Sequence, residues 1–175
     1  MQERAKQSCC ICRHILLHPW YASAQVVGGY VPLKWEADVT EVLRHVIASG
    51  RTLALPLCGA KGAMTLRRVR SLEELIPGAY GIPEPMEDSE IIDAADVSLL
   101  LTPLEGIDLT GMRLGKGGGY YDRLLAGKSV RTMGCALSWQ WTGRVPQERW
   151  DRPLCACCDP QGVQIFCDIL RSEEH

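Results

Sequence analysis

The segment from Arg113 to Arg123 holds the densest group of residues that could bind an anion. It reads R-L-G-K-G-G-G-Y-Y-D-R, so Arg113 and Lys116 place positive charges beside the consecutive glycines 117–119. Glycines leave backbone N–H groups uncovered, which lets them approach a ligand closely. A helix is expected to begin at Tyr120, and its N-terminus adds a partial positive charge. The pattern predicts a phosphate-binding loop; the alternative is a glycine-rich connector between a strand and a helix.

The spacing of these glycines differs from that of the two commonest nucleotide-binding loops. Neither G-x-x-x-x-G-K-[ST] nor G-x-G-x-x-G occurs in the segment. The protein as a whole does not attract anions, because 19 basic and 21 acidic residues give a net charge of −2. We therefore expect neither nucleic acid nor a membrane as a partner, and an anion must be held by local contacts.

The loop must be positioned by the elements around it, which alternate between helix and strand patterns. Apolar residues recur at helical spacing over 2–18, where Pro19 should stop the helix, and again over 40–50. The run 97–101 is continuously apolar, as in parallel strands buried on both faces. Further strands are expected over 24–33, 52–57, 63–69, 130–137, 154–158 and 163–167, and a helix over 120–126. We predict one α/β domain over residues 1–175, with three layers and a largely parallel sheet flanked by helices.

The N-terminus and the nine cysteines bear on where the protein resides. Residues 1–4 lack the apolar run of a secretory signal, and no apolar stretch has the length of a membrane span. We therefore expect a cytoplasmic protein with reduced thiols. The pairs Cys9/Cys12 and Cys155/Cys158 have zinc-like spacing, but a site built from both needs the chain ends to meet. We favour small buried core residues as the role of the cysteines.

Four segments together resemble the 5-formyltetrahydrofolate cyclo-ligase family. The loop Arg113–Arg123 is similar to that family's signature, R-L-G-x-G-G-G-Y-Y-D-R. Tyr30–Asp38 resembles its early strand, Tyr80–Pro85 its middle Y-G-I-x-E-P loop, and Val145–Asp151 its late V-P-x-x-x-H-D segment. Four motifs in the same order are far more specific than any one of them. The resemblance implies a three-layer α/β fold, in agreement with the pattern of elements.

The resemblance also implies an activity. Members of this family use the cofactors ATP and Mg²⁺ to close 5-formyltetrahydrofolate into 5,10-methenyltetrahydrofolate, releasing ADP and phosphate. Such chemistry asks a protein mainly for positioning and charge neutralisation. We expect a monomer whose partner is this small-molecule substrate. One alternative is a divergent, non-catalytic paralogue that binds nucleotide or reduced folate, and a more distant one is a phosphate-binding enzyme of another class.

Individual roles follow from the same resemblance. Lys116 and Tyr120 are assigned both to catalysis and to substrate binding. Val31 and Glu36 are assigned to substrate binding. For Glu36 the alternative is a solvated acid ahead of a helix. Met64 and Trp139 are candidates for the pterin slot, with core packing as the alternative. The residues assigned to ATP are Arg113, Leu114, Gly115, Lys116, Gly117, Gly118, Gly119, Tyr120 and Tyr121.

Asp122 and Asp151 match the family's metal-binding positions. Mg²⁺ prefers oxygen ligands and usually keeps several waters, so that one or two carboxylates suffice. Each residue has a simpler interpretation, Asp122 as an acid at a helix N-terminus and Asp151 as the cap of a turn. Glu84 lies between two prolines that fix its backbone, so we expect it to be structural or at the rim of the site.

The sequence departs from the family pattern in several places. Relatives generally begin with an additional basic helix that helps to hold ATP and folate, and this sequence opens in the segment after it. We expect either that the natural start lies upstream or that the protein lacks this part of the nucleotide-binding segment, with Arg4 and Lys6 as candidate substitutes. In Pro103–Asp108 the family's P-G-x-x-F-D becomes P-L-E-G-I-D. Leu104 would be strained at a positive φ, and Glu105 adds negative charge near the expected phosphate. Trp150 stands where the family usually has histidine.

Overall fold

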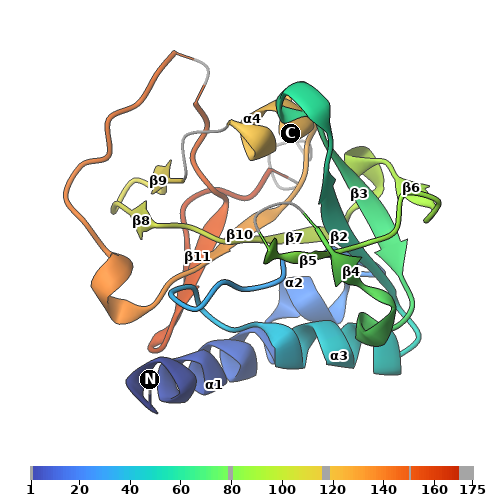
Figure 1. Cartoon of the computed structure of the whole chain (residues 1–175). Helices are drawn as coiled ribbons and strands as arrows, with labels where there is room; N and C mark the ends of the chain where they lie inside the picture. Colours follow the sequence, from blue (N-terminus) through green and yellow to red (C-terminus); the bar gives the residue numbers. More distant parts are fainter. Residues whose placement is uncertain (1, 79–80, 116–118, 150, 170–175) are drawn as a thin grey trace.

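A mainly parallel sheet forms the centre of the protein. The computed structural model describes residues 2–78, 81–115, 119–149 and 151–169. The strand order is β12-β11-β10-β7-β1-β2-β3-β6 (Figure 1). The strands from β11 to β2 run parallel, while β12, β3 and β6 are antiparallel to their neighbours. Their bounds are β1 Val26–Gly28, β2 Thr52–Cys58, β3 Met64–Val69, β6 Ile91–Ile92, β7 Leu99–Thr102, β10 Thr132–Cys135, β11 Ala156–Asp159 and β12 Gly162–Ile165.

Helices cover both faces of this sheet, as Figure 1 shows. On one face lie α1 (Gln2–Leu16), α2 (Pro19–Ala22) and α3 (Thr40–Ala48); on the other lies α4 (Tyr120–Leu125). Side chains alternate along β7 accordingly: Leu99 and Leu101 pack in the cluster under α1 and α3, and Leu100 packs in the cluster that includes residues of α4. The predicted α/β fold, with a largely parallel sheet flanked by helices, is confirmed.

Short elements complete the fold. Two small ladders pair β4 with β5 and β8 with β9. The β8–β9 ladder lies inside residues 102–119, where only a loop was expected from the sequence. The bounds are β4 Ile76–Pro77, β5 Pro83–Glu84, β8 Gly106–Ile107 and β9 Arg113–Leu114, with 3₁₀ turns η1 Ala60–Gly62, η2 Leu72–Glu74, η4 Ala94–Asp96 and η5 Ser138–Gln140.

The strand expected over residues 24–33 ends early, at Gly28, because the chain then curls back on itself. The Tyr30 hydroxyl donates to the carbonyl of Ala37 at 2.8 Å. The backbone N–H of Leu33 donates to the Glu36 carboxylate at 2.8 Å. These local bonds replace a sheet ladder, so residues 30–37 form a folded loop after β1.

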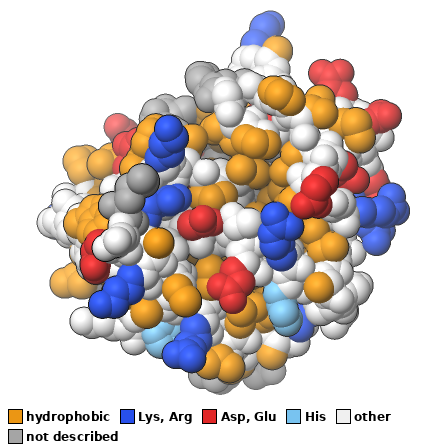
Figure 2. Space-filling model, turned by 60° about the horizontal axis from the view of Figure 1, so that its bottom comes forward, with side chains coloured by type: hydrophobic (Ala, Val, Ile, Leu, Met, Phe, Trp, Pro, Cys, Tyr) orange, Lys and Arg blue, Asp and Glu red, His pale blue; other side chains and the backbone are white. Residues whose placement is uncertain are grey.

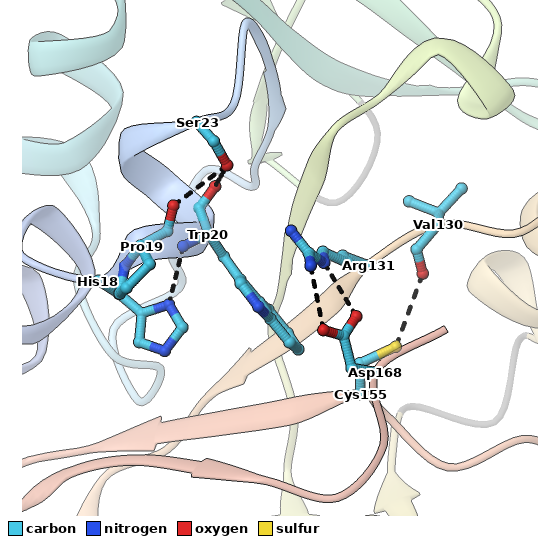
Figure 3. Close-up of polar contacts among 8 residues, drawn as sticks. All are labelled: His18, Pro19, Trp20, Ser23, Val130, Arg131, Cys155 and Asp168. Atoms are coloured by element: carbon cyan, nitrogen blue, oxygen red, sulfur yellow. Dashed lines mark hydrogen bonds and ion pairs between the residues drawn. The ribbon is translucent and has the colours of Figure 1, made fainter. Parts of the chain in front are cut away.

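Pro19 ends α1 as predicted and then begins α2. Proline suits the first position of a helix, where its missing N–H is not needed. His18 caps the turn by accepting from the backbone N–H of Trp20 at 3.1 Å, as Figure 3 shows. Trp20 in turn packs against Arg131, whose guanidinium lies 4.6 Å from the centre of the indole ring.

Arg131 also binds the C-terminal segment. Its guanidinium faces the carboxylate of Asp168 in Figure 3 and donates to both oxygens, at 3.1 and 3.0 Å. Both side chains are largely covered, with exposed fractions of 17% and 13%. Planar two-point pairs of this kind are the stronger ion pairs in proteins. The contact joins α2, the start of β10 and the segment after β12 at the amino end of the parallel strands.

The cysteines are mostly internal. The thiol of Cys158 on β11 donates to the carbonyl of Ile11 on α1 at 3.5 Å, so segments near the two ends of the chain do meet. Burial raises the pKa of Cys12 to about 12, which keeps this thiol protonated. The described residues contain no group of three His, Cys, Asp or Glu side chains arranged to hold a metal. The core role is confirmed for Cys12, Cys135, Cys155, Cys157 and Cys158 and is wrong for the exposed Cys9 and Cys167.

The outer surface shows no strong segregation of charge on the side that carries α1 and α3. Figure 2 shows basic and acidic side chains interspersed with apolar ones over this side. This distribution agrees with the net charge of −2. Among the described helices, none has the length and apolar character needed to cross a membrane.

Candidate active site

A cavity of about 480 Å³ opens at the carboxyl ends of β1, β2 and β7. Tyr30 and Val31 follow β1, Cys58 ends β2, and Pro103 follows β7. From β1 the chain moves to β2 on one side, and β7 adds on the other side, so the order of strands reverses here. Open α/β sheets bind their ligands at such a switch point, outside the carboxyl ends of the strands.

Most of the residues predicted from the sequence meet in this cavity. Lys116, Gly117 and Gly118 lie outside the described residues. Met64 lines the cavity, whereas Trp139 lies on the surface with 56% of its area exposed. The predicted residues that line it are Val31, Glu36, Arg113, Leu114, Gly115, Gly119, Tyr120, Tyr121, Asp122 and Asp151.

Arg113 is held in place at the wall of the cavity. It lies on β9, which pairs with β8, and its guanidinium donates to the carbonyl of Pro103 at 3.3 Å. The same guanidinium lies 4.8 Å from the centre of the Tyr121 ring. Burial raises the pKa of Tyr121, and the lowering effect of Arg113 is too small to offset it, so the phenol stays neutral. The structure thus presents a fixed positive charge beside a neutral ring.

The start of α4 is anchored from the opposite side. Gly119 precedes the helix with φ +64°, a conformation that side chains rarely adopt. Arg123 donates two hydrogen bonds to the carbonyl of Gly62, at 3.2 and 2.9 Å. Its guanidinium also lies 5.4 Å from the centre of the Tyr120 ring. Arg123, which had no role in the sequence analysis, therefore positions Tyr120 at the cavity.

Glu36 is buried, with 5% of its area exposed, so its interpretation as a solvated acid is wrong. Arg4 supports its loop by donating to the carbonyls of Glu36 and Leu33, at 2.7 and 2.9 Å. Arg4 therefore positions a wall of the cavity through the backbone and does not line it. Lys6 lines a separate hollow beside α1. Neither Arg4 nor Lys6 lines the cavity at the carboxyl ends of the strands.

The two candidate metal ligands differ in their surroundings. Asp122 lies in the first turn of α4 and is exposed at the cavity. Asp151 accepts from the backbone N–H of Glu148 at 2.7 Å, which closes a turn as its simpler interpretation requires. That bond uses Oδ2, and Asp151 still lines the cavity. A turn cap and a metal ligand are therefore compatible roles for this residue.

Glu84 was expected to be structural or to lie at the rim of the site, and the second of these alternatives is wrong. Only 8% of its area is exposed, and it lies in the wall of the cavity and not at the rim. The thiol of Cys58 lies beside the Glu84 carboxylate, and burial together with this carboxylate raises the pKa of Cys58. The Pro-Glu-Pro sequence was the available signal, because flanking prolines hold a side chain in a fixed direction.

The departures in Pro103–Asp108 prove compatible with the fold. Leu104 is buried, and among the described residues only Lys61 has a positive φ outside glycine, so the predicted strain does not arise. Gly134 makes room for Leu104, since a Cβ there would lie 2.8 Å from the leucine Cδ2. Glu105 does line the cavity and is exposed to solvent. Trp150 lies outside the described residues.

Asp108 connects two walls of the cavity. It is buried and accepts from the backbone N–H groups of Thr110, Met112 and Val145, at 2.8, 3.1 and 2.9 Å, and from the Thr110 hydroxyl at 2.6 Å. Burial alone would raise the pKa of this carboxyl, but the hydrogen bonds outweigh it and lower the pKa. Asp108 thus fixes the start of the Val145–Asp151 segment against the β8–β9 ladder.

The protein is thus of the α/β class, and its cavity lies where the order of strands reverses. Cavities in this position are the usual binding sites for small ligands in such folds. The chain is 27% identical over 168 residues to the 5-formyltetrahydrofolate cyclo-ligase of Escherichia coli K12, covering 93% of this chain and 91% of that protein. Its structure is similar to the NMR structure of Aquifex aeolicus 5,10-methenyltetrahydrofolate synthetase, with a TM-score of 0.83 and 34% identity over 95% of this chain and 84% of that one.

A 5,10-methenyltetrahydrofolate synthetase from Mycoplasma pneumoniae has the same fold, with a TM-score of 0.72 and 18% identity over 91% of this chain and 88% of that one. The sequence description of the 5-formyltetrahydrofolate cyclo-ligase family matches residues 1–160. The chain therefore belongs to this family of ligase enzymes, which confirms the resemblance drawn from the four motifs.

Proposed function

We propose that this protein uses ATP and Mg²⁺ to convert 5-formyltetrahydrofolate into 5,10-methenyltetrahydrofolate, with ADP and phosphate as the other products. The observation that carries the proposal is that one cavity collects side chains from all four motif segments. Family membership supports the reaction class. The representatives of the four segments in the cavity are Val31 and Glu36, Ile82 and Glu84, Arg113 and Tyr121, and Val145 and Asp151.

The triphosphate of ATP is proposed to lie along the wall formed by β9 and the start of α4. Arg113 supplies a charge whose direction is fixed by Pro103 and Tyr121. Gly115 and Gly119 line the same wall without side chains that would block the approach of phosphate. Leu114 and the undescribed Lys116, Gly117 and Gly118 keep the ATP-binding role that the family signature implies.

The charges around the cavity favour a divalent cation with the nucleotide. Its described basic side chains are Arg113 and Arg152, whereas its acidic ones are Glu36, Glu84, Glu105, Asp122, Glu148 and Asp151. A polyphosphate placed among these acids would be repelled unless a cation lies between them. Asp122 and Asp151 are proposed as its carboxylate ligands, and two such ligands suit Mg²⁺, which completes its shell with waters and phosphate oxygens. Bound there, Mg²⁺ would neutralise the charge of the transferred phosphoryl group.

The reduced folate is proposed to occupy the side of the cavity bounded by β1 and β2. Val31 and Glu36 enter from the folded loop after β1, which Arg4 holds at two carbonyls. The Glu36 carboxylate keeps one oxygen on the Leu33 N–H. A buried, oriented carboxylate of this kind suits the N–H groups of a reduced folate better than it suits phosphate.

The reaction needs the formyl oxygen close to the γ-phosphorus. The oxygen attacks that phosphorus as ADP leaves. N10 then attacks the formyl carbon and loses its proton, and the C–O bond breaks so that phosphate leaves with the former formyl oxygen. Lys116 and Tyr120 are proposed as the catalytic residues, and Arg123 holds the Tyr120 ring near the reacting atoms. Met112, Leu104 and Val145 give the cavity apolar walls that limit water, which would otherwise hydrolyse the phosphorylated intermediate.

Purified protein tests this proposal directly. We expect phosphate release from ATP only when both Mg²⁺ and 5-formyltetrahydrofolate are present, with methenyl product formed in equal amount and detected by its near-ultraviolet absorbance. Binding of both ligands without product would instead support the non-catalytic paralogue. Phosphate release that does not depend on the folate would contradict both interpretations.

A further inference from the structure

Glu84 is a buried acid that no cation neutralises within the described part of the chain. It belongs to none of the ion pairs found there, which join Arg44 to Glu73, Arg68 to Glu90, Lys128 to Asp93 and Arg131 to Asp168. Its side-chain neighbour is the thiol of Cys58, and a thiol is at most a weak donor. Burying a carboxylate is costly unless strong donors satisfy it. Because Glu84 faces a cavity, a ligand is the natural source of those donors.

The side chain of Glu84 is held in place before any ligand arrives. The residue lies on β5 between Pro83 and Pro85, and β5 pairs with β4 through Ile76. On its other side it packs on the bare backbone of Gly78, where an added Cβ would lie 2.4 Å from the glutamate Cγ and Cδ. A carboxylate fixed in this way loses little conformational entropy when it binds a ligand.

The surroundings of Glu84 suit a flat ring. Cys58 and Met64 are direct neighbours across the β2–β3 ladder, and both line the cavity together with Pro56 and Ile82. The arrangement is typical of a slot that takes an aromatic or partly reduced heterocycle and reads one polar edge of it.

We propose that Glu84 binds the amino-pyrimidine edge of the pterin ring of the folate, an inference that rests on the proposed function. This edge carries an N–H and an adjacent amino group, which match the two oxygens of one carboxylate. The adenine of ATP fits less well, because its amino group is flanked by acceptor nitrogens that a carboxylate would repel. Glu36, with one oxygen on the Leu33 N–H, is left for the reacting side of the substrate.

Glu84→Gln tests this assignment with almost no change in shape. Titration calorimetry with 5-formyltetrahydrofolate should show affinity reduced about ten- to a hundredfold, the usual loss for a hydrogen bond to a charged group. Affinity for a non-hydrolysable ATP analogue should stay within about twofold of the parent protein. The matched control is Glu87→Gln, an exposed acid in the following loop, which should leave both affinities unchanged.

A folate analogue without the 2-amino group separates recognition from general damage. The parent protein should bind it more weakly than 5-formyltetrahydrofolate, whereas Glu84→Gln should bind the two compounds about equally. The same loss of affinity for both compounds, or an equal loss for the ATP analogue, would overturn the assignment and make Glu84 a structural residue. Binding is measured without turnover, so absence of ring closure by the parent protein would contradict the proposed function alone.

Discussion

The two ends of the parallel strands both contain largely buried carboxylates, but they satisfy them in different ways. At the amino end, Asp168 forms a two-point ion pair with Arg131, and Trp20 covers the guanidinium. At the carboxyl end, Glu84 lies beside the Cys58 thiol, forms no ion pair with a described residue and lines a cavity. The first arrangement satisfies its own charge and joins chain segments. For the second, we have proposed that a ligand supplies the donors that the described residues do not.

This contrast helps to separate structural from functional acids in the protein. Asp108 belongs with the structural group, because three backbone N–H groups and a hydroxyl surround its carboxylate. Glu36 combines both features, with one oxygen on the backbone and a position in the cavity wall. Variants of these acids should therefore divide between loss of stability and loss of ligand affinity.

The largest effect is expected for Asp168→Ala, which leaves Arg131 without its partner under Trp20. Removing one member of a buried ion pair destabilises proteins by about 3–5 kcal/mol, so this partly covered pair should cost about 2–4 kcal/mol. Urea unfolding measures this change in the free energy of unfolding. Glu90→Ala is the control, since it removes the exposed partner of Arg68 and should barely change stability. Loss of folate affinity without loss of stability would contradict the structural assignment.

Glu36→Gln should weaken folate binding while sparing ATP. The amide oxygen can still accept from the Leu33 N–H, so the loop should survive, but the charge that faces the cavity is lost. We expect a loss of about 1.5–3 kcal/mol, roughly ten- to a hundredfold in affinity. Separate titrations with 5-formyltetrahydrofolate and an ATP analogue measure it. Equal losses for the two ligands would indicate damage to the loop.

Asp122→Asn should raise the Mg²⁺ concentration needed for half-maximal ring closure, by roughly tenfold. The side chain is exposed, so thermal stability should stay close to that of the parent protein. Turnover measured over a range of Mg²⁺ at fixed ATP tests this. An unchanged Mg²⁺ dependence would leave Asp122 with only its role at the helix N-terminus.

The smallest effect concerns pH and Asp108. Its pKa is lower in the folded protein than in the unfolded chain, where an aspartate has a pKa of about 3.9. Its hydrogen bonds therefore stabilise the fold above that value, and this contribution is lost as pH falls through the lower, folded pKa. Denaturant unfolding between neutral and acidic pH should show a shallower acid loss for Asp108→Asn than for the parent protein. An identical pH profile would show that Asp108 does not titrate with folding.

The sequence by itself determined the class of fold and most of the residues that line the cavity. The continuous apolar run at β7 predicted a strand buried on both faces. A strand covered by helices on both sides needs apolar side chains at every position, so this feature is visible in the sequence itself. The helix after the glycine-rich loop was expected over 120–126 and lies at Tyr120–Leu125. Motif segments far apart in the chain were assigned to one site, and their described members do line one cavity.

Only the tertiary structure decided which partners the charged residues take. Arg4 and Leu33 are 29 residues apart, and no local pattern indicates that their contact supports the Glu36 loop. The burial of Glu84 depends on the missing side chain of Gly78 and on Cys58 from another strand. Leu104 avoids the expected strain because its φ is not positive, and Gly134 on β10 leaves space for its side chain. Periodicity and motifs report on neighbours along the chain, whereas burial and charge pairing depend on contacts that exist only after the sheet has assembled.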